Sequence, residues 1–201
     1  MKRGLKIVEH QDFLNLKAGA EVLEADPHGE KVLRLADGTI LKLFRRKRLI
    51  TSAAWYPYAQ RFADNAVALQ QRGIPVPCLI AVMRIPSVKR DAVHYHLLEG
   101  TTLRQLVRQG LDPKTGQALK KRFTEFVIHL HALGIYFRSL HLGNVVLTPS
   151  GELGLIDFSD LRVYSRPLPV FMRRRNIQRM LGIDSEREWI DSEAILNRRA
   201  V

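Results

Sequence analysis

Residues 130–160 read LHALGIYFRSLHLGNVVLTPSGELGLIDFSD and carry the most information about the fold. It contains two short apolar runs, VVL and LGLI, and the tripeptide PSG between them is a turn signal. The pattern predicts a loop, a short strand, a turn and a second short strand. Asn144 stands just before the first of these strands, and Asp157 directly follows the second.

Amphipathic helices precede this stretch. The segment TTLRQLVRQG starts with a threonine cap, and ALKKRFTEFVIHLHALG (118–134) carries apolar residues at helical spacing and ends at a glycine. The tail, residues 162–201, is basic and helical in character. The second half of the chain therefore predicts a mainly helical lobe.

The first half of the chain has the period of strands. Three alternating runs lie between Ala20 and Phe44, separated by the turn sequences PHG and DG. A helix is predicted over 59–73, and CLIAVMRI and AVHYHLL predict two more strands on either side of the turn-prone PSVKRD. The expected fold class is α+β, with a five-stranded antiparallel sheet and one helix in the N-terminal half.

Length and composition favour a single bilobal domain. The 201 residues are 46% hydrophobic and 26% charged, which is ordinary for a globular protein. The boundary is expected at Glu99-Gly100, giving lobes of 1–99 and 100–201. The single cysteine, Cys78, excludes an internal disulfide and a CxxC site, which favours a reducing compartment. Neither a signal peptide nor a run of ~18 apolar residues is visible, so a cytoplasmic protein is expected.

Three short features follow one another in an order that matters: ILKLF on the third strand, LHLGNVVL after the long helix, and LIDF on the following strand. With residues 130–160 they resemble the catalytic segment of bacterial small-molecule and sugar kinases, which have a protein-kinase-like fold. HLLEGTTLRQLV resembles the hinge and following helix of those kinases, and RGIPVP resembles their helix-to-strand connector. The tail LPVFMRRRNIQRML resembles the end of the lipopolysaccharide kinase family, whose members phosphorylate Kdo or heptose of the inner core. The resemblance spans residues 20–182 and is greatest to the short members labelled toluene tolerance proteins.

This resemblance implies a two-lobed fold with a reduced helical C-terminal lobe, and phosphoryl transfer from ATP to a sugar hydroxyl of an envelope glycolipid. Lys42 would contact the nucleotide phosphates from the third strand. Asn144 and Asp157 would bind the nucleotide through Mg²⁺, an ion that prefers hard oxygen ligands together with phosphate oxygens.

The main departure from the family lies at the catalytic base. Where the family places its catalytic His and Asp, this chain has Phe137, Arg138 and Ser139. A serine hydroxyl cannot accept a proton at neutral pH, so Ser139 marks the position of a missing base, with Arg138 beside it. Asp160 and His141 are possible substitutes. Two hypotheses stay open: an active sugar kinase, or a catalytically impaired pseudokinase that binds nucleotide or a partner in envelope biogenesis and solvent tolerance.

Two further departures concern the lysine and the phosphate loop. Phe62 or Asn65 stands where the family has the helix glutamate that pairs with the lysine. The first predicted turn has a single glycine, Gly29, which favours a plain hairpin turn over a glycine-rich phosphate loop.

The histidines predict structural roles. His94 and His96 share a strand face, but no carboxylate or cysteine completes a metal site there. His131 matches a structural position of the family and is predicted to be packed and hydrogen-bonded.

The net charge of +12 predicts an anionic partner. Basic clusters stand at 45–48 (RRKR) and 173–175 (RRR), and the aromatic cluster at 55–58 (WYPY) resembles an interfacial anchor. These features favour an anionic glycolipid or the inner-membrane surface, with the protein held there peripherally. Nucleic acid is the competing partner, but the aromatics do not alternate with arginines as a stacking platform for bases would.

Overall fold

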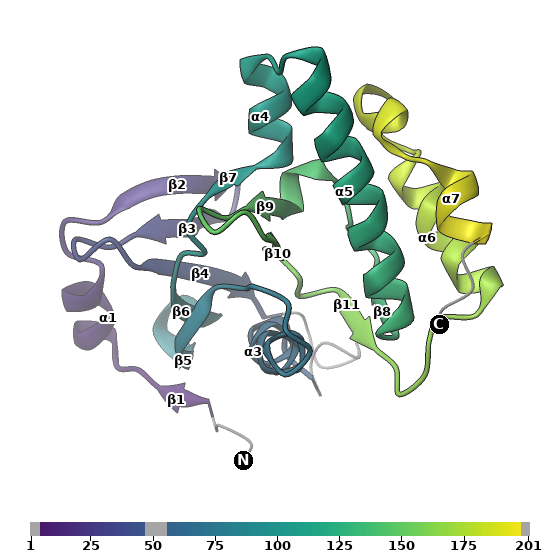
Figure 1. Ribbon diagram of the computed structural model, residues 1–201. Helices are drawn as coiled ribbons and strands as arrows, with labels where there is room; N and C mark the ends of the chain where they lie inside the picture. The colour runs from purple at the N-terminus through teal and green to yellow at the C-terminus, as the bar shows by residue number, and fades with distance from the viewer. Residues whose placement is uncertain (1–4, 47–55, 198–201) are drawn as a thin grey trace. The chain divides into compact units, whose positions relative to one another are not determined.

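The computed structural model describes residues 5–46 and 56–197. The chain divides into an N-terminal unit, Met1–Val67 with Pro77–Leu97, and a C-terminal unit, Ala68–Val76 with Leu98–Val201. Both units combine helices and strands, so the protein belongs to the α+β class, as predicted (Figure 1). The segment 68–76 belongs to the C-terminal unit, although its neighbours on both sides in the chain belong to the N-terminal one.

The N-terminal unit is built on a six-stranded sheet with the strand order β1-β5-β6-β4-β3-β2. The strands are β1 (Lys6–Ile7), β2 (Glu21–Asp26), β3 (Gly29–Arg34), β4 (Ile40–Arg45), β5 (Cys78–Ile85) and β6 (Arg90–His96). The helices of this part are α1 (His10–Leu16), α3 (Tyr58–Gln70) and the short 3-10 helix η1 (Pro86–Val88). Neighbouring strands are antiparallel except β1, which pairs with β5 in parallel.

The prediction of five strands and one helix for this half is wrong, because β1 and α1 have to be added. β1 has only two residues, so no alternation of apolar and polar side chains can reveal it. α1 has seven residues and buries Phe13 alone, which is too narrow an apolar stripe to show as helical periodicity.

Alternate residues of β4 lie on opposite faces of the sheet. Leu41 belongs to a buried cluster that includes Phe13 of α1. On the other face, the ring of Phe44 lies 6.5 Å from that of Phe62 on α3. Lys42 shares the face of Phe44, and its Nζ lies 5.8 Å from the centre of that ring. The alternation therefore places Lys42 on the α3 side of the sheet.

The C-terminal unit is mainly helical. It holds α4 (Leu103–Gln109), α5 (Pro113–Ala132), η2 (Leu142–Asn144), α6 (Val170–Met180), η3 (Asp184–Trp189) and α7 (Ser192–Asn197). α7 packs against both α5 and α6 (Figure 1). α5 begins before the predicted residue 118, because the Asp112 side chain accepts from the backbone of Lys114 and Thr115 and Pro113 occupies the first helical position.

Two antiparallel ribbons carry the segment 130–160. β9 (Val145–Leu147) pairs with β7 (Thr101–Thr102) and β10 (Leu153–Leu155), and β8 (Ile135–Phe137) pairs with β11 (Leu161–Val163). β9 and β10 are the two predicted short strands, whereas β7, β8 and β11 are not predicted. The loop 138–144 joins β8 to β9, and the loop 156–160 joins β10 to β11, so strand pairing fixes both loops at each end.

None of the helices in the described part of the chain has the length and the apolar composition that crossing a bilayer requires.

Candidate functional site

Asn144 and Asp157 lie at the same end of the β9–β10 ribbon. Val145, the first residue of β9, pairs with Leu155, the last residue of β10. The pairing continues one step further, where Ile156 N donates to Asn144 O at 3.0 Å. The ribbon therefore places Asn144 beside Ile156, the residue before Asp157. The predicted metal pair requires this proximity.

The backbone of Asp157 lies in the left-handed region, with φ at 53°. Asp tolerates this region better than most residues, but the conformation still costs about 1–2 kcal/mol. Such conformations cluster at active sites and ligand-binding loops. The turn lies between β10 and the fully buried Phe158, so packing on both sides holds Asp157 in this conformation.

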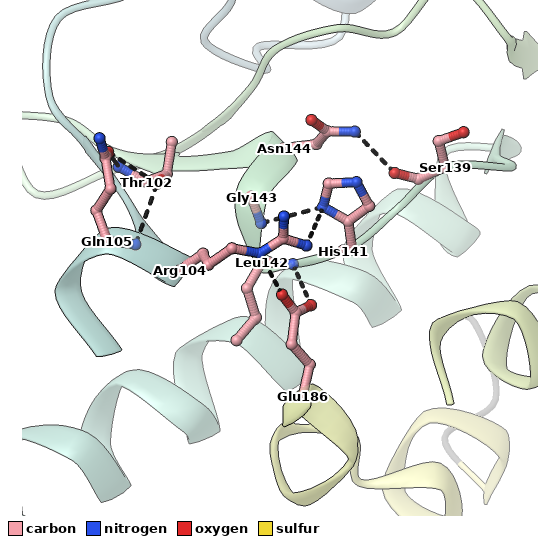
Figure 2. A network of polar contacts seen from close by, with 9 residues as sticks. All are labelled: Thr102, Arg104, Gln105, Ser139, His141, Leu142, Gly143, Asn144 and Glu186. Carbon is pink, nitrogen blue, oxygen red and sulfur yellow. Dashed lines mark hydrogen bonds and ion pairs between the residues drawn. The ribbon is translucent and has the colours of Figure 1, made fainter. Parts of the chain in front are cut away.

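The side chain of Asn144 is held in one orientation. Asn144 is 8% exposed, and its Nδ2 donates to Ser139 O at 2.9 Å. Figure 2 shows the amide nitrogen pointing to Ser139 and the amide oxygen pointing away from it. The amide oxygen Oδ1, which is the atom that can bind a cation, takes no part in this hydrogen bond.

Ser139 and Arg138 directly follow β8, and both are exposed. Ser139 Oγ donates to Asp160 Oδ2 at 2.5 Å. The pairing of Phe137 with Leu161 explains this contact, because it places the residues after β8 beside the residues before β11. The structure therefore brings the Asp160 carboxylate to Ser139.

Glu186, on η3, is the centre of a network that the sequence does not predict. It is 3% exposed; its Oε1 accepts from Arg104 Nε at 2.6 Å and its Oε2 accepts from Leu142 N at 2.8 Å. Arg104 also donates to His141 Nδ1 at 3.1 Å (Figure 2). The network ties α4 and η3 to the loop that carries Asn144. Arg104 and Glu186 are 82 positions apart, so no local pattern points to their pairing.

The ring of His141 is fixed as a neutral tautomer. Its Nδ1 accepts from Gly143 N at 3.1 Å and from Arg104, which places the ring proton on Nε2. Burial and the charge of Arg104 lower the pKa of His141, while Glu186 and Asp157 act in the opposite direction. Because its lone pair is already engaged, His141 does not suit the role of substitute base.

The two residues predicted to hold a magnesium ion, Asn144 and Asp157, lie on adjoining loops. The described residues contain no group of three or more His, Cys, Asp or Glu side chains that could hold a metal ion. Mg²⁺ is usually held by one or two carboxylates together with substrate phosphates and water. The Asp157 carboxylate and Asn144 Oδ1 are two hard oxygen donors, and these residues would hold the ion. The ion would neutralise charge on the phosphates.

The N-terminal unit carries the other predicted nucleotide contact, Lys42 on β4. Phe62, one of the two residues that the resemblance places at the glutamate position, is 1% exposed and belongs to the core. Gly29 has φ at 110° and begins β3 after a turn in which Asp26 Oδ1 accepts from His28 N at 2.7 Å. The predicted hairpin turn between β2 and β3 is present.

Two of the three histidines predicted to have structural roles are buried and hydrogen-bonded, whereas His96 is exposed at the end of β6. His94 Nε2 lies 2.7 Å from Thr39 Oγ1. His131 is 2% exposed and donates through Nε2 to Asn176 Oδ1 at 3.0 Å, while Asn176 Nδ2 donates to Phe137 O at 2.8 Å. The prediction of a packed, hydrogen-bonded His131 is confirmed.

The described part of the aromatic cluster is held by α3. Tyr56 OH donates to Asp64 Oδ2 at 2.7 Å, and the Arg61 guanidinium lies 5.2 Å from the centre of the Tyr56 ring. Burial and the neighbouring Asp64 raise the pKa of Tyr56 to about 12. Trp55 and residues 47–48 of the first basic cluster lie outside the described residues.

The second basic cluster lies on α6 and is not uniform. Arg174 and Arg175 are exposed, whereas Arg173 is half-buried and its Nη1 donates to Ile195 O at 3.3 Å. Two of the three arginines are thus exposed.

Neither a scan against models of protein families nor a search of curated proteins finds a significant match to this chain.

Proposed function

We propose that the chain is a protein-kinase-like phosphotransferase of two lobes that binds Mg²⁺-ATP and transfers a phosphoryl group to a sugar hydroxyl of an envelope glycolipid. Lys42 and the pair Asn144 and Asp157 are assigned to the nucleotide, and the position of Ser139 is assigned to the acceptor. Transfer of this kind needs mainly positioning and charge neutralisation, which a lysine, a cation and its ligands supply.

One observation carries this proposal. The two loops of the segment 130–160 converge. Ile156 N, next to Asp157 in the chain, donates to Asn144 O, Asn144 Nδ2 donates to Ser139 O, and Ser139 Oγ donates to Asp160 Oδ2. Oxygen donors for a cation and a hydroxyl with a carboxylate partner thus lie in one place. That is the set of groups a phosphoryl transfer uses.

A second function is favoured by the identity of one residue. Ser139 in place of an aspartate removes a direct general base, which can cost about 10²–10⁴ in rate. A protein with this substitution can serve as a pseudokinase, a nucleotide- or partner-binding module of the envelope without phosphoryl transfer.

The proposed partner is an anionic glycolipid or the cytoplasmic face of the inner membrane, with the protein attached peripherally. The outer face of α6 supports it: Phe171 is 71% exposed, and Arg174 and Arg175 follow at the spacing that places them on the same side of the helix. A large apolar ring flanked by arginines suits a headgroup surface, where each basic residue contributes about 1 kcal/mol.

The first test measures the melting temperature of the full chain with and without millimolar Mg²⁺-ATP. A ligand at 100 times its dissociation constant stabilises a fold by about 2.7 kcal/mol, so the wild type should melt several degrees higher. Asp157→Asn is the sharpest variant, because Asn also tolerates the left-handed backbone and only the charge is lost. It should abolish the shift, as should Lys42→Met.

Transfer itself is tested by incubating the protein with labelled ATP and envelope glycolipid. Labelled glycolipid that is lost with Asp157→Asn supports the kinase. A thermal shift without any labelled product supports the binding module, and the absence of a shift contradicts both.

A further inference from the structure

The contact between Ser139 and Asp160 has the geometry of a charge-assisted hydrogen bond. The distance of 2.5 Å from Ser139 Oγ to Asp160 Oδ2 is at the short end of the range for a hydroxyl that donates to a carboxylate. The β8–β11 pairing next to it fixes the backbones of both residues, and Asn144 Nδ2 holds Ser139 O. The serine hydroxyl is therefore oriented toward the carboxylate by its surroundings.

The second oxygen of Asp160 is buried. Asp160 Oδ1 is inaccessible to solvent and has no hydrogen-bond partner among the described residues. A buried carboxylate oxygen left in this state is costly, and such exceptions in native structures call for an explanation. With Oδ1 buried and Oδ2 bonded to Ser139, a proton arriving from outside has one evident route to Asp160, through the exposed hydroxyl of Ser139.

We infer that Ser139 and Asp160 form a proton relay that replaces the missing general base, an inference that rests on the proposed phosphotransferase function. A serine hydroxyl is too weak a base to hold a proton, but it has lone pairs to accept one while it donates another. Because Ser139 Oγ donates to the Asp160 carboxylate, the hydroxyl can pass the proton on to Asp160, which is a strong enough base to hold it.

The step balances as follows in atoms and charge. The acceptor oxygen forms a bond to the γ-phosphorus of ATP, and the bond from that phosphorus to the bridging oxygen breaks, with its electron pair going to ADP. The proton of the acceptor hydroxyl passes to Ser139 Oγ as the proton of Ser139 passes to Asp160 Oδ2. Ser139 ends as a neutral hydroxyl and Asp160 as a neutral acid, which then releases its proton to solvent.

The relay is tested with water as acceptor, so that no sugar has to be identified. The full chain is incubated with Mg²⁺-ATP, release of ADP gives kcat, and a separate titration gives the dissociation constant of the nucleotide. Asp160→Asn and Ser139→Ala should each lower kcat by about 10²-fold and leave the dissociation constant unchanged. Ser139→Thr keeps the hydroxyl and should stay within a few-fold of the wild type. Unchanged melting temperatures without nucleotide check that the variants fold.

The outcomes separate the relay from the function on which it rests. Equal turnover in the wild type, Asp160→Asn and Ser139→Ala overturns the relay and leaves the phosphotransferase standing. Nucleotide binding without turnover in the wild type also overturns the relay and supports the binding module. Failure to bind nucleotide overturns the proposed function itself. Equal losses in Ser139→Ala and Ser139→Thr show that the hydroxyl is not what matters, and the relay is then wrong.

Discussion

Glu186 uses both of its carboxylate oxygens to hold the loop of Asn144. One oxygen accepts from Arg104 Nε and the other accepts from Leu142 N. The Glu186 side chain is almost fully buried. The resemblance to sugar kinases predicts Asn144 and Asp157, which flank two recognisable strands, but neither it nor any local pattern predicts Glu186 or Arg104. Their pairing depends on how helices that are distant in the sequence pack together. The sequence around each residue looks the same as that around a charged residue exposed to solvent.

Glu186→Gln should destabilise the protein by about 2 kcal/mol. The amide keeps one acceptor but loses the charge that faces Arg104, and hydrogen bonds to charged groups contribute about 1.5–3 kcal/mol. Urea denaturation measures the change. Glu188→Gln, at an exposed position on the same 3-10 helix, is the matched control and should change stability by less than about 0.5 kcal/mol. Equal effects of the two substitutions would contradict the network.

His131 makes the stability of the C-terminal unit depend on pH. Burial lowers the pKa of His131 from its ordinary value of 6.5, so below this pH the unfolded chain takes up a proton that the folded chain does not. The stabilisation is therefore present above about pH 6.5 and is lost as the pH falls toward the lowered value.

His131→Gln removes this dependence. The variant should be less stable than the wild type at pH 7.5, because the packed ring is lost, and the difference should shrink by about 1 kcal/mol at pH 5.5. Urea midpoints at the two pH values give the result. His129→Gln, an exposed change on the same helix, is the control and should alter stability by less than about 0.5 kcal/mol. A constant difference for His131→Gln as well would refute the buried neutral ring.

The long elements of the fold could be predicted, and the shortest could not. β5 matches its predicted range because eight residues with strand composition lie between turn signals. β7, β8 and β11 have two or three residues each, and no period can be measured over so few. These short strands nevertheless matter for the site, because the β8–β11 pairing is what brings Asp160 to Ser139.

Gly154, in the middle of β10, leaves no room for a side chain. A Cβ atom there would lie 2.6 Å from Pro75 O and 2.5 Å from Leu98 Cδ2. Pro75 O also accepts from Leu155 N at 2.9 Å, so the carbonyl cannot move away without losing that bond. The helix-to-strand connector therefore packs directly on this strand.

Gly154→Ala should cost about 1–3 kcal/mol of stability through overpacking. Gly116→Ala is the matched control, since this glycine lies inside α5 and the nearest atom to its Cβ would be 3.8 Å away. The control should be neutral or stabilise by up to about 1 kcal/mol, because Ala favours a helix. Both changes are read from thermal or urea unfolding, and a neutral Gly154→Ala would contradict the close packing.

At the scale of the whole molecule, the charge of +12 attracts every anionic surface, so specificity has to come from where the charge lies. The proposed membrane face joins charge to an exposed apolar ring on α6. This combination distinguishes it from the basic residues of α4 and α5, two helices on which no large hydrophobic side chain is exposed.

Arg174→Gln with Arg175→Gln should weaken binding to phosphatidylglycerol vesicles about thirtyfold, the equivalent of about 1 kcal/mol per charge. Phe171→Ser should weaken vesicle binding as well, and the loss in affinity should depend less on the salt concentration than the loss caused by removing the arginines. Arg108→Gln with Lys121→Gln removes the same charge from exposed positions of α4 and α5 and should have a much smaller effect. Vesicle sedimentation gives the affinities, and phosphatidylcholine vesicles provide the uncharged reference. Equal losses in the two double variants would show that net charge, not the α6 face, governs attachment.

The segment 68–76 also determines how the protein behaves when its chain is cut. Since these residues belong to the C-terminal unit, the chain passes between the units three times, after residues 67, 76 and 97. A protease that nicks the chain after residue 97 yields a first fragment that still contains Pro75, the acceptor for Leu155 N of the second. The two fragments should therefore remain associated and elute together under native conditions. A polypeptide that begins at residue 98 lacks Pro75 and therefore the acceptor for Leu155 N. We expect it to be insoluble unless the nine residues 68–76 are restored.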